Sequence, residues 1–96
     1  MASWGDLETY DEMISDLKTF INSVNESCAG MTLAAQQCAE ELDNDVASLK
    51  AASALLKSVQ KYQSALELAS ELLASLQIER DELEILLRKN DEFDTE

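Results

Sequence analysis

The sequence predicts an all-α fold: an elongated antiparallel helical hairpin of two long helices that dimerises into a four-helix bundle. Among 96 residues there are two glycines and no proline, so few residues suit the tight turns and edges of a β fold. Apolar residues recur at alternating steps of three and four, the period of helices that pack against each other. Because 46% of the residues are hydrophobic, a disordered chain is excluded.

The first helix is predicted over about 6–42, with Asp6 as its N-cap. An unbroken heptad pattern defines its packing stripe, which we call the seam: Leu7, Tyr10, Ile14, Leu17, Ile21, Val24, Cys28, Met31, Ala35, Cys38 and Leu42. Met13 and Phe20 widen this stripe. Since the pattern stays in phase across Gly30, a continuous helix is favoured over a break there. Such a break would give a three-helix bundle, which is the alternative fold.

A turn is predicted at 43–45, with Asp45 as the cap of a second helix over about 46–89 and a frayed acidic tail over 90–96. The seam of this helix is Leu55, Val59, Tyr62, Leu66, Ala69, Leu73, Leu76, Arg80, Leu83 and Leu87. The aliphatic stem of Arg80 can lie along the seam with its charge outside. Before the seam, a slightly rotated stripe is expected at Leu49, Ala52 and Leu56.

The second helix carries more apolar residues than one seam uses, which predicts contact with a further helix. The short connection makes the two helices antiparallel, and a lone pair of this size is marginal. We therefore expect a homodimer or a helical protein partner. The surface expected to meet it comprises Trp4, Leu17, Phe20, Ile21, Leu68, Leu72, Ile78, Ile85 and Leu86. For Trp4 itself, a hydrophobic staple that packs back near Tyr10 is favoured over an exposed anchor for a partner.

The chain is strongly acidic, with 20 Asp and Glu against 7 Lys and Arg, a net charge of -13. Residues 1–45 hold ten of the acids and one base. This charge repels nucleic acid and anionic membrane, so we expect neither as a partner. A basic partner protein fits the charge, and solubility alone is the alternative explanation.

No catalytic, cofactor-binding or metal site is predicted. Histidine, the commonest general base and metal ligand, is absent. Cys28 and Cys38 lie about 15 Å apart along one helix, too far for a disulfide or a shared ion. They are read as small buried hydrophobes or, alternatively, as the halves of an intermolecular bridge. We expect no enzyme, no cofactor and no small-molecule substrate.

Two helices of about forty residues in a chain near one hundred resemble the WXG100 family of helical hairpins over residues 6–89. The family's Trp-x-Gly belongs at the turn, where this chain has Asp43-Asn44-Asp45, whereas Trp4-Gly5 is N-terminal here. The export motif, Tyr followed four residues later by an acid, is absent, since Ile14 follows Tyr10 and Leu66 follows Tyr62. The resemblance implies a dimer and an accessory role in type VII secretion beside large secreted toxins.

The N-terminus lacks the basic start and apolar stretch of a signal peptide. We expect a protein that is cytoplasmic at synthesis and, by the resemblance, secreted without a cleaved signal peptide. Its expected function is a helical protein–protein interaction module, a secretion partner or targeting factor that pairs with itself or a longer helical protein. The alternatives are an acidic inhibitor (immunity, antitoxin-like or anti-defence protein) of a basic protein, and a coiled-coil component of a larger assembly.

Overall fold

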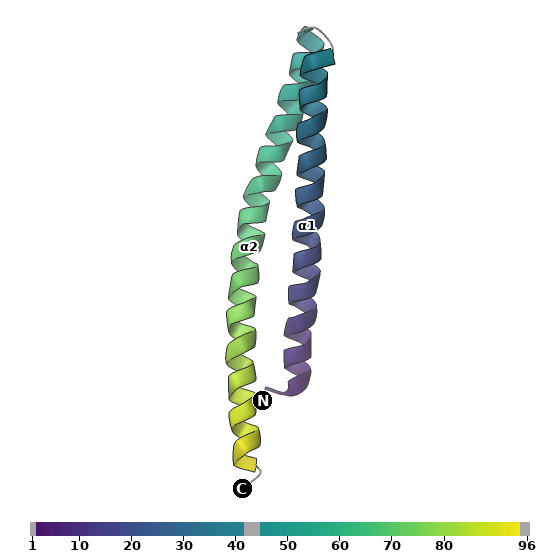
Figure 1. The fold of residues 1–96 in the computed structure, drawn as a ribbon. Helices are drawn as coiled ribbons and strands as arrows, with labels where there is room; N and C mark the ends of the chain where they lie inside the picture. The colour runs from purple at the N-terminus through teal and green to yellow at the C-terminus, as the bar shows by residue number, and fades with distance from the viewer. Residues whose placement is uncertain (1, 42–44, 95–96) are drawn as a thin grey trace. The chain divides into compact units, whose positions relative to one another are not determined.

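The computed structural model describes residues 2–41 and 45–94, and two helices dominate these ranges (Figure 1). Helix α1 spans Trp4–Glu41 and helix α2 spans Val46–Asp94. No strand occurs in either range. Packing divides the chain into a terminal unit, residues 1–20 with 69–96, and a central unit, residues 21–68. The predicted all-α helical hairpin is confirmed.

Each unit is an antiparallel pair of helical segments. In the terminal unit the start of α1 lies beside the end of α2, and two side-chain bonds join them: Tyr10 to Glu79, and Arg80 to Asp11. In the central unit the rest of α1 lies beside the start of α2 (Figure 1).

Helix α1 begins two residues earlier than predicted, because Ser3 rather than Asp6 is its cap. The backbone N–H of Asp6 donates to the Ser3 hydroxyl at 3.4 Å, and the backbone N–H of Ser3 donates to the Asp6 carboxylate at 2.8 Å. This reciprocal pair is a capping box. Trp4 therefore lies in the first helical turn, and the predicted staple was wrong because a staple residue precedes the cap.

Both helices are continuous. Since α1 runs through Gly30, the three-helix alternative was wrong. Asp45 stands at the cap position of α2, where its carbonyl accepts the backbone N–H of Leu49 at 3.0 Å. The prediction that α2 ends at Lys89 was also wrong: it continues to Asp94, because no proline or glycine follows to stop it. Predicted seam residue Leu42 and turn residues 43–44 lie outside the described ranges.

Burial confirms the seam. Its described members on α1 are all buried or half-buried, and on α2 only Tyr62, 47% exposed, departs from this. The most buried apolar residues of the described ranges are Leu7, Ile14, Cys28, Ala35, Ala52, Val59, Ala69 and Leu87. In the described ranges no large side chain is fully buried, as expected where two helices can enclose only one stripe between them.

The seam of α2 begins differently from the prediction. Leu49 and Leu56 are exposed, whereas Ser48 is buried beside Ala52. The steps of three and four simply continue backwards from Val59 through Leu55 and Ala52 to Ser48. The rotated stripe was therefore wrong at Leu49 and Leu56 but right at Ala52, and the small polar Ser48 occupies the next seam position.

We expect the seam, and not the outward face, to hold the helix pair together. Ile14→Ala should lower the free energy of unfolding by about 2 kcal/mol or more, because it removes buried side-chain volume. Its neighbour Met13 is 41% exposed, so Met13→Ala should cost less than about 1 kcal/mol. Urea unfolding followed by circular dichroism measures both. Equal losses would contradict the assignment of the seam.

Gly30 lies inside α1, where glycine has a low helix propensity. A Cβ added there meets nothing within 4 Å, so alanine fits without displacing a neighbour. Gly30→Ala should raise the free energy of unfolding by about 1 kcal/mol, because alanine has the higher helix propensity. As the matched control, exposed Ala29→Gly should lower it by a similar amount. Destabilisation by Gly30→Ala would show that this position is covered in solution.

Candidate partner-binding surface

Seven of the nine residues predicted to meet a partner are exposed. Their exposed fractions are Trp4 44%, Phe20 50%, Leu68 67%, Leu72 52%, Ile78 60%, Ile85 56% and Leu86 53%. The other two, Leu17 and Ile21, are half-buried. Ile21 and Leu68 belong to the central unit and the remaining seven to the terminal unit.

Three of these residues come together in the terminal unit. An open groove of about 370 Å³, which we call the Phe20 groove, is lined by Met13, Asp16, Leu17, Phe20, Leu72 and Leu76. A second hollow of about 440 Å³, the Tyr10 groove, shares Met13 with it. It is lined by Ala2, Asp6, Thr9, Tyr10, Met13 and Leu83. The two hollows thus adjoin at Met13, and each has one carboxylate in its lining, Asp6 or Asp16.

Sequence reasoning missed some of the groove residues and included others that lie elsewhere. Met13, Leu76 and Asp16 were not among the predicted interface residues, although the seven-residue spacing of Met13 and Phe20 was a usable signal. Ile85 lies instead beside Asp81, Glu84 and Arg88 in a small polar hollow. Trp4, Ile78 and Leu86 line none of these hollows. The predicted residues are therefore not one surface.

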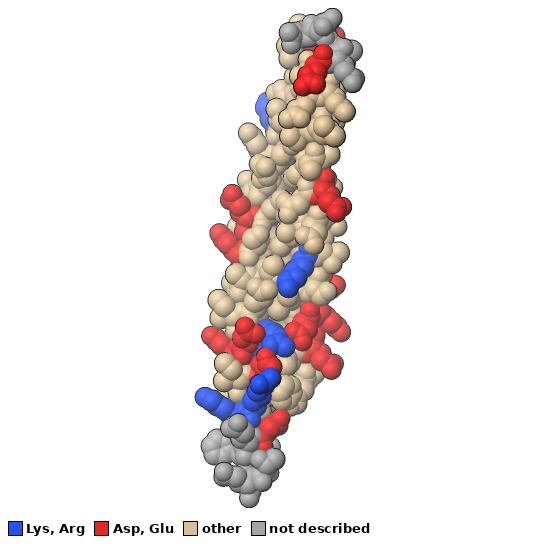
Figure 2. Space-filling view, in the orientation of Figure 1, with Lys and Arg blue, Asp and Glu red and all other residues tan. Residues whose placement is uncertain are grey.

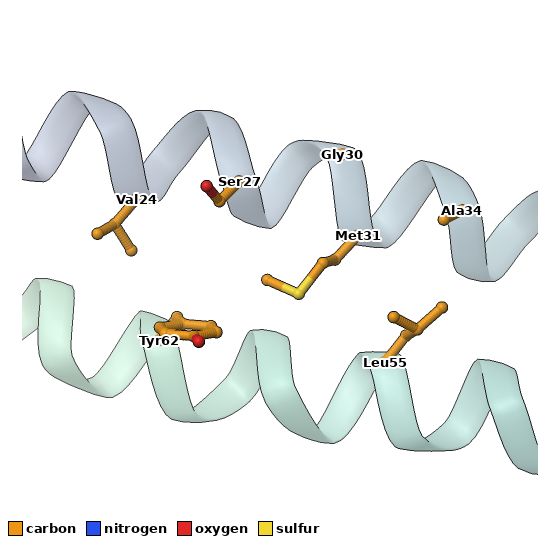
Figure 3. Close-up of a pocket in the computed structure, with 7 residues that line it drawn as sticks. All are labelled: Val24, Ser27, Gly30, Met31, Ala34, Leu55 and Tyr62. Atoms are coloured by element: carbon orange, nitrogen blue, oxygen red, sulfur yellow. The ribbon is translucent and has the colours of Figure 1, made fainter.

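The central unit has its own groove, of about 520 Å³. Met31 points from α1 towards α2 between Leu55 and Tyr62, and Val24 faces the Tyr62 ring (Figure 3). Small residues of α1 complete the lining: Ser27, Gly30 and Ala34. No charged side chain lines this groove among the described residues, so it differs chemically from the grooves of the terminal unit.

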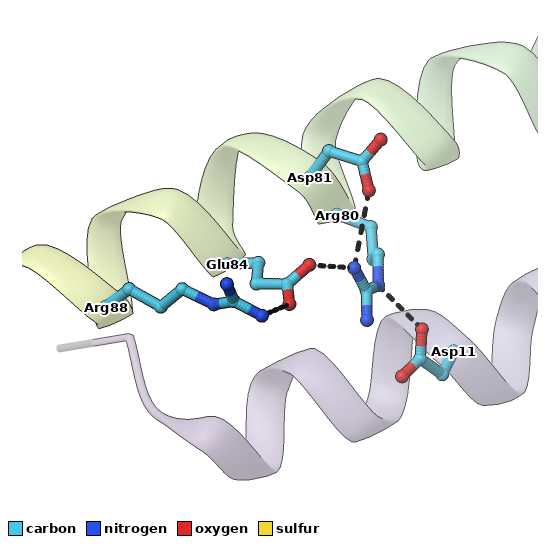
Figure 4. Close-up of polar contacts among 5 residues, drawn as sticks. All are labelled: Asp11, Arg80, Asp81, Glu84 and Arg88. Carbon is cyan, nitrogen blue, oxygen red and sulfur yellow. Dashed lines mark hydrogen bonds and ion pairs between the residues drawn. The ribbon is translucent and has the colours of Figure 1, made fainter.

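An ionic cluster lies in the terminal unit, apart from the grooves (Figure 4). The Nε of Arg80 donates to Asp11 at 2.8 Å, and its Nη1 contacts Asp81 at 3.3 Å and Glu84. Arg88 binds the other Glu84 oxygen at 2.7 Å. Hydrogen bonding to Asp11 raises the pKa of Arg80 further, so this residue stays charged. The Arg80–Asp11 bond joins α1 to α2, and Arg80 lies in the seam with its charge outside, as predicted.

Negative charge gathers on the terminal unit. It contains 14 acidic and 4 basic residues, a net charge of -10, whereas the central unit has 6 and 3, a net of -3. On the face seen in Figure 2, red and blue side chains gather over the coloured part of the terminal unit, and much of the central unit is uncharged. Comparing residues 1–45 with the rest of the sequence does not reveal this contrast in charge between the units. The pairing of the helices brings residues from both ends of the chain into the terminal unit.

The hydroxyl of Tyr10 bonds to an acidic side chain at the edge of the Tyr10 groove. This hydroxyl donates to Glu79 Oε2 at 3.1 Å. That hydrogen bond, then the Glu79 charge, burial and the Asp6 charge, raise the pKa of Tyr10 above its ordinary value of 10.0. Glu79 and Asp6 thus place negative charge beside Tyr10.

Within the described ranges, no group of three or more acidic or cysteine side chains is arranged to hold a metal ion. Cys28 and Cys38 are both free thiols, the first buried and the second half-buried. A search of the described residues found no helix long and apolar enough to cross a membrane.

Comparison with protein-family models, with curated proteins and with solved structures found no match to this chain.

The Tyr10–Glu79 bond should be measurable as a tyrosine titration. In a Tyr62→Phe background, absorbance should show Tyr10 titrating above 10.0, and Glu79→Gln should lower that pKa. Exposed Glu71→Gln is the matched control and should leave it unchanged. Because the folded pKa is raised, the stability from this bond is present below pH 10 and is lost as pH rises through the folded value. An unchanged pKa in Glu79→Gln would contradict the bond.

Proposed function

We propose that this chain is a non-enzymatic helical protein–protein interaction module. Its outward apolar side chains pair with helices of a second chain, which is either another copy or a longer helical protein. One observation carries the proposal: the terminal unit leaves large apolar side chains at its surface, among them Phe20, Leu72, Ile78 and Ile85, each at least half exposed. Of these, Phe20 and Leu72 line one groove, and a contiguous exposed apolar surface on a small domain is typical of an interaction site.

The energetics favour a partner. Full burial of a Leu or Phe side chain contributes about 1.5–3 kcal/mol, so each half-exposed residue has roughly half of this still to gain. Several such residues together offset a substantial part of the entropic cost of association, which is about 4–15 kcal/mol. The free pair, in contrast, fully buries no large side chain in the described ranges.

A finer form of the proposal is a type VII secretion partner or targeting factor that is made in the cytoplasm and leaves the cell without a cleaved signal peptide. Two antiparallel helical segments in each unit and the resemblance to WXG100 hairpins support it. No functional residue of that family maps onto this chain, so this form depends on architecture.

The net charge of -10 on the terminal unit favours a second candidate. An acidic inhibitor would cover a basic site of its target, such as a nucleic-acid-binding surface. Its binding would weaken steeply with salt, because the energy would be mainly electrostatic. Binding that depends on Phe20 and Leu72 and is insensitive to salt would exclude this candidate.

Purification of the tagged chain from its native host tests the main proposal. We expect a helical protein or an untagged second copy to co-purify in equimolar amount, and the double variant Phe20→Ser, Leu72→Ser to lose it. The control Gln63→Ser changes an exposed polar residue of α2 and should retain the partner. A chain that purifies alone, with a light-scattering mass near 10.6 kDa, would overturn the proposal.

A further inference from the structure

The two adjoining grooves of the terminal unit combine an apolar floor with an acidic edge. Met13, Leu17, Phe20, Leu72 and Leu76 supply the apolar side chains of the Phe20 groove. Met13 continues this surface into the Tyr10 groove beside Leu83. From Asp6 to Phe20, α1 rises about 21 Å, so the joint surface is long enough for some four turns of a docked helix.

The edge of this surface is acidic throughout the described residues. Asp16 lines the Phe20 groove and Asp6 lines the Tyr10 groove, and no basic side chain lines either of them in the described ranges. Glu79 lies at the same edge, bound to Tyr10. Arg80 and Arg88 are engaged in the ionic cluster and are not placed to neutralise this edge.

Charge decides between the possible occupants. A second copy docked by its own terminal unit would bring two units of net charge -10 together and would place Asp6 and Asp16 near their counterparts. Like charges at close range disfavour such a pair. A helix with Lys or Arg beside an apolar stripe would instead bury its apolar side chains and pair its charges with the edge.

Building on the proposed function, we propose that the joined Phe20 and Tyr10 grooves bind a basic amphipathic helix of the partner, with leucine-type side chains on Phe20 and Leu72 and lysine or arginine beside Asp16 and Asp6. The grooves supply affinity through burial, and the acidic edge selects the charge of the helix. This names the chemistry of the partner and the place where it docks.

Three labelled helical peptides of about 18 residues test this by fluorescence anisotropy against the full chain. The first has a leucine stripe with flanking lysines, the second has the same stripe with glutamates, and the third keeps the lysines but replaces leucine by serine. We expect the first to bind about tenfold or more tightly than either of the others, and its affinity to fall with salt.

Matched variants of the chain locate the site. Phe20→Ser should weaken the leucine–lysine peptide about tenfold, whereas Ile78→Ser removes an even more exposed apolar residue outside the grooves and should have little effect. Asp16→Asn should weaken it about threefold or more, and Glu12→Gln, an exposed acid that lines neither groove, should not. Circular dichroism confirms that each variant is folded.

Each of the other possible results contradicts a specific part of the inference. If the glutamate peptide binds as tightly and Phe20→Ser weakens both peptides, the basic-helix inference fails while the interaction module stands. If the serine–lysine peptide binds as tightly as the leucine–lysine peptide, binding is by charge alone and the groove assignment fails. If no peptide binds but a host protein co-purifies through Phe20 and Leu72, the inference fails and the proposed function is retained.

Discussion

Two helices can share only one contact stripe, and the rest of this structure depends on that constraint. The seam takes the residues at steps of three and four, from Leu7 and Ile14 on α1 to Val59 and Leu87 on α2, and leaves even these slightly exposed. Every further apolar residue must then lie outside. Because α2 has apolar side chains on several sides, many of them stay exposed, among them Leu68, Leu72 and Ile78.

The terminal unit has two flanks with different chemistry. By the helical period, Met13 and Asp11 of α1 lie on opposite sides of the seam that contains Ile14. On the Asp11 flank, Arg80 joins α1 to α2 through a charged bond of 2.8 Å. On the Met13 flank lie the two grooves, whose linings include Asp6 and Asp16 but no basic side chain among the described residues. The ionic flank helps to fix how the segments pair, and the apolar flank is the one that we propose binds another protein.

Periodicity in the sequence was sufficient to predict both helices, the seam and the placement of the Arg80 stem. Periodicity did not reveal the capping box between Ser3 and Asp6, because Trp4, which lies between them, was interpreted as a hydrophobic staple that precedes the helix. Ser48 was not predicted to be in the seam, because the seam was identified from apolar residues only. A small polar residue can be buried at a seam position, as Ser48 is. The predicted antiparallel hairpin already implied that 1–20 pairs with 69–94, but it did not reveal the grooves, because their lining depends on which side chains of the two helices meet. A one-dimensional pattern places residues on a helix face but does not show which faces meet.

Hydroxyl-radical footprinting tests most directly that the seam is closed while the outward face is open for a partner. The dilute chain is labelled alone and with the leucine–lysine peptide, and modification is read by mass spectrometry. We expect Ile14 and Val59 to stay protected in both samples, while Met13, Phe20 and Leu72 are modified in the free chain and protected in the complex. Modification of Ile14 and Val59 at the level of Phe20, or no protection of Phe20 on binding, would contradict this.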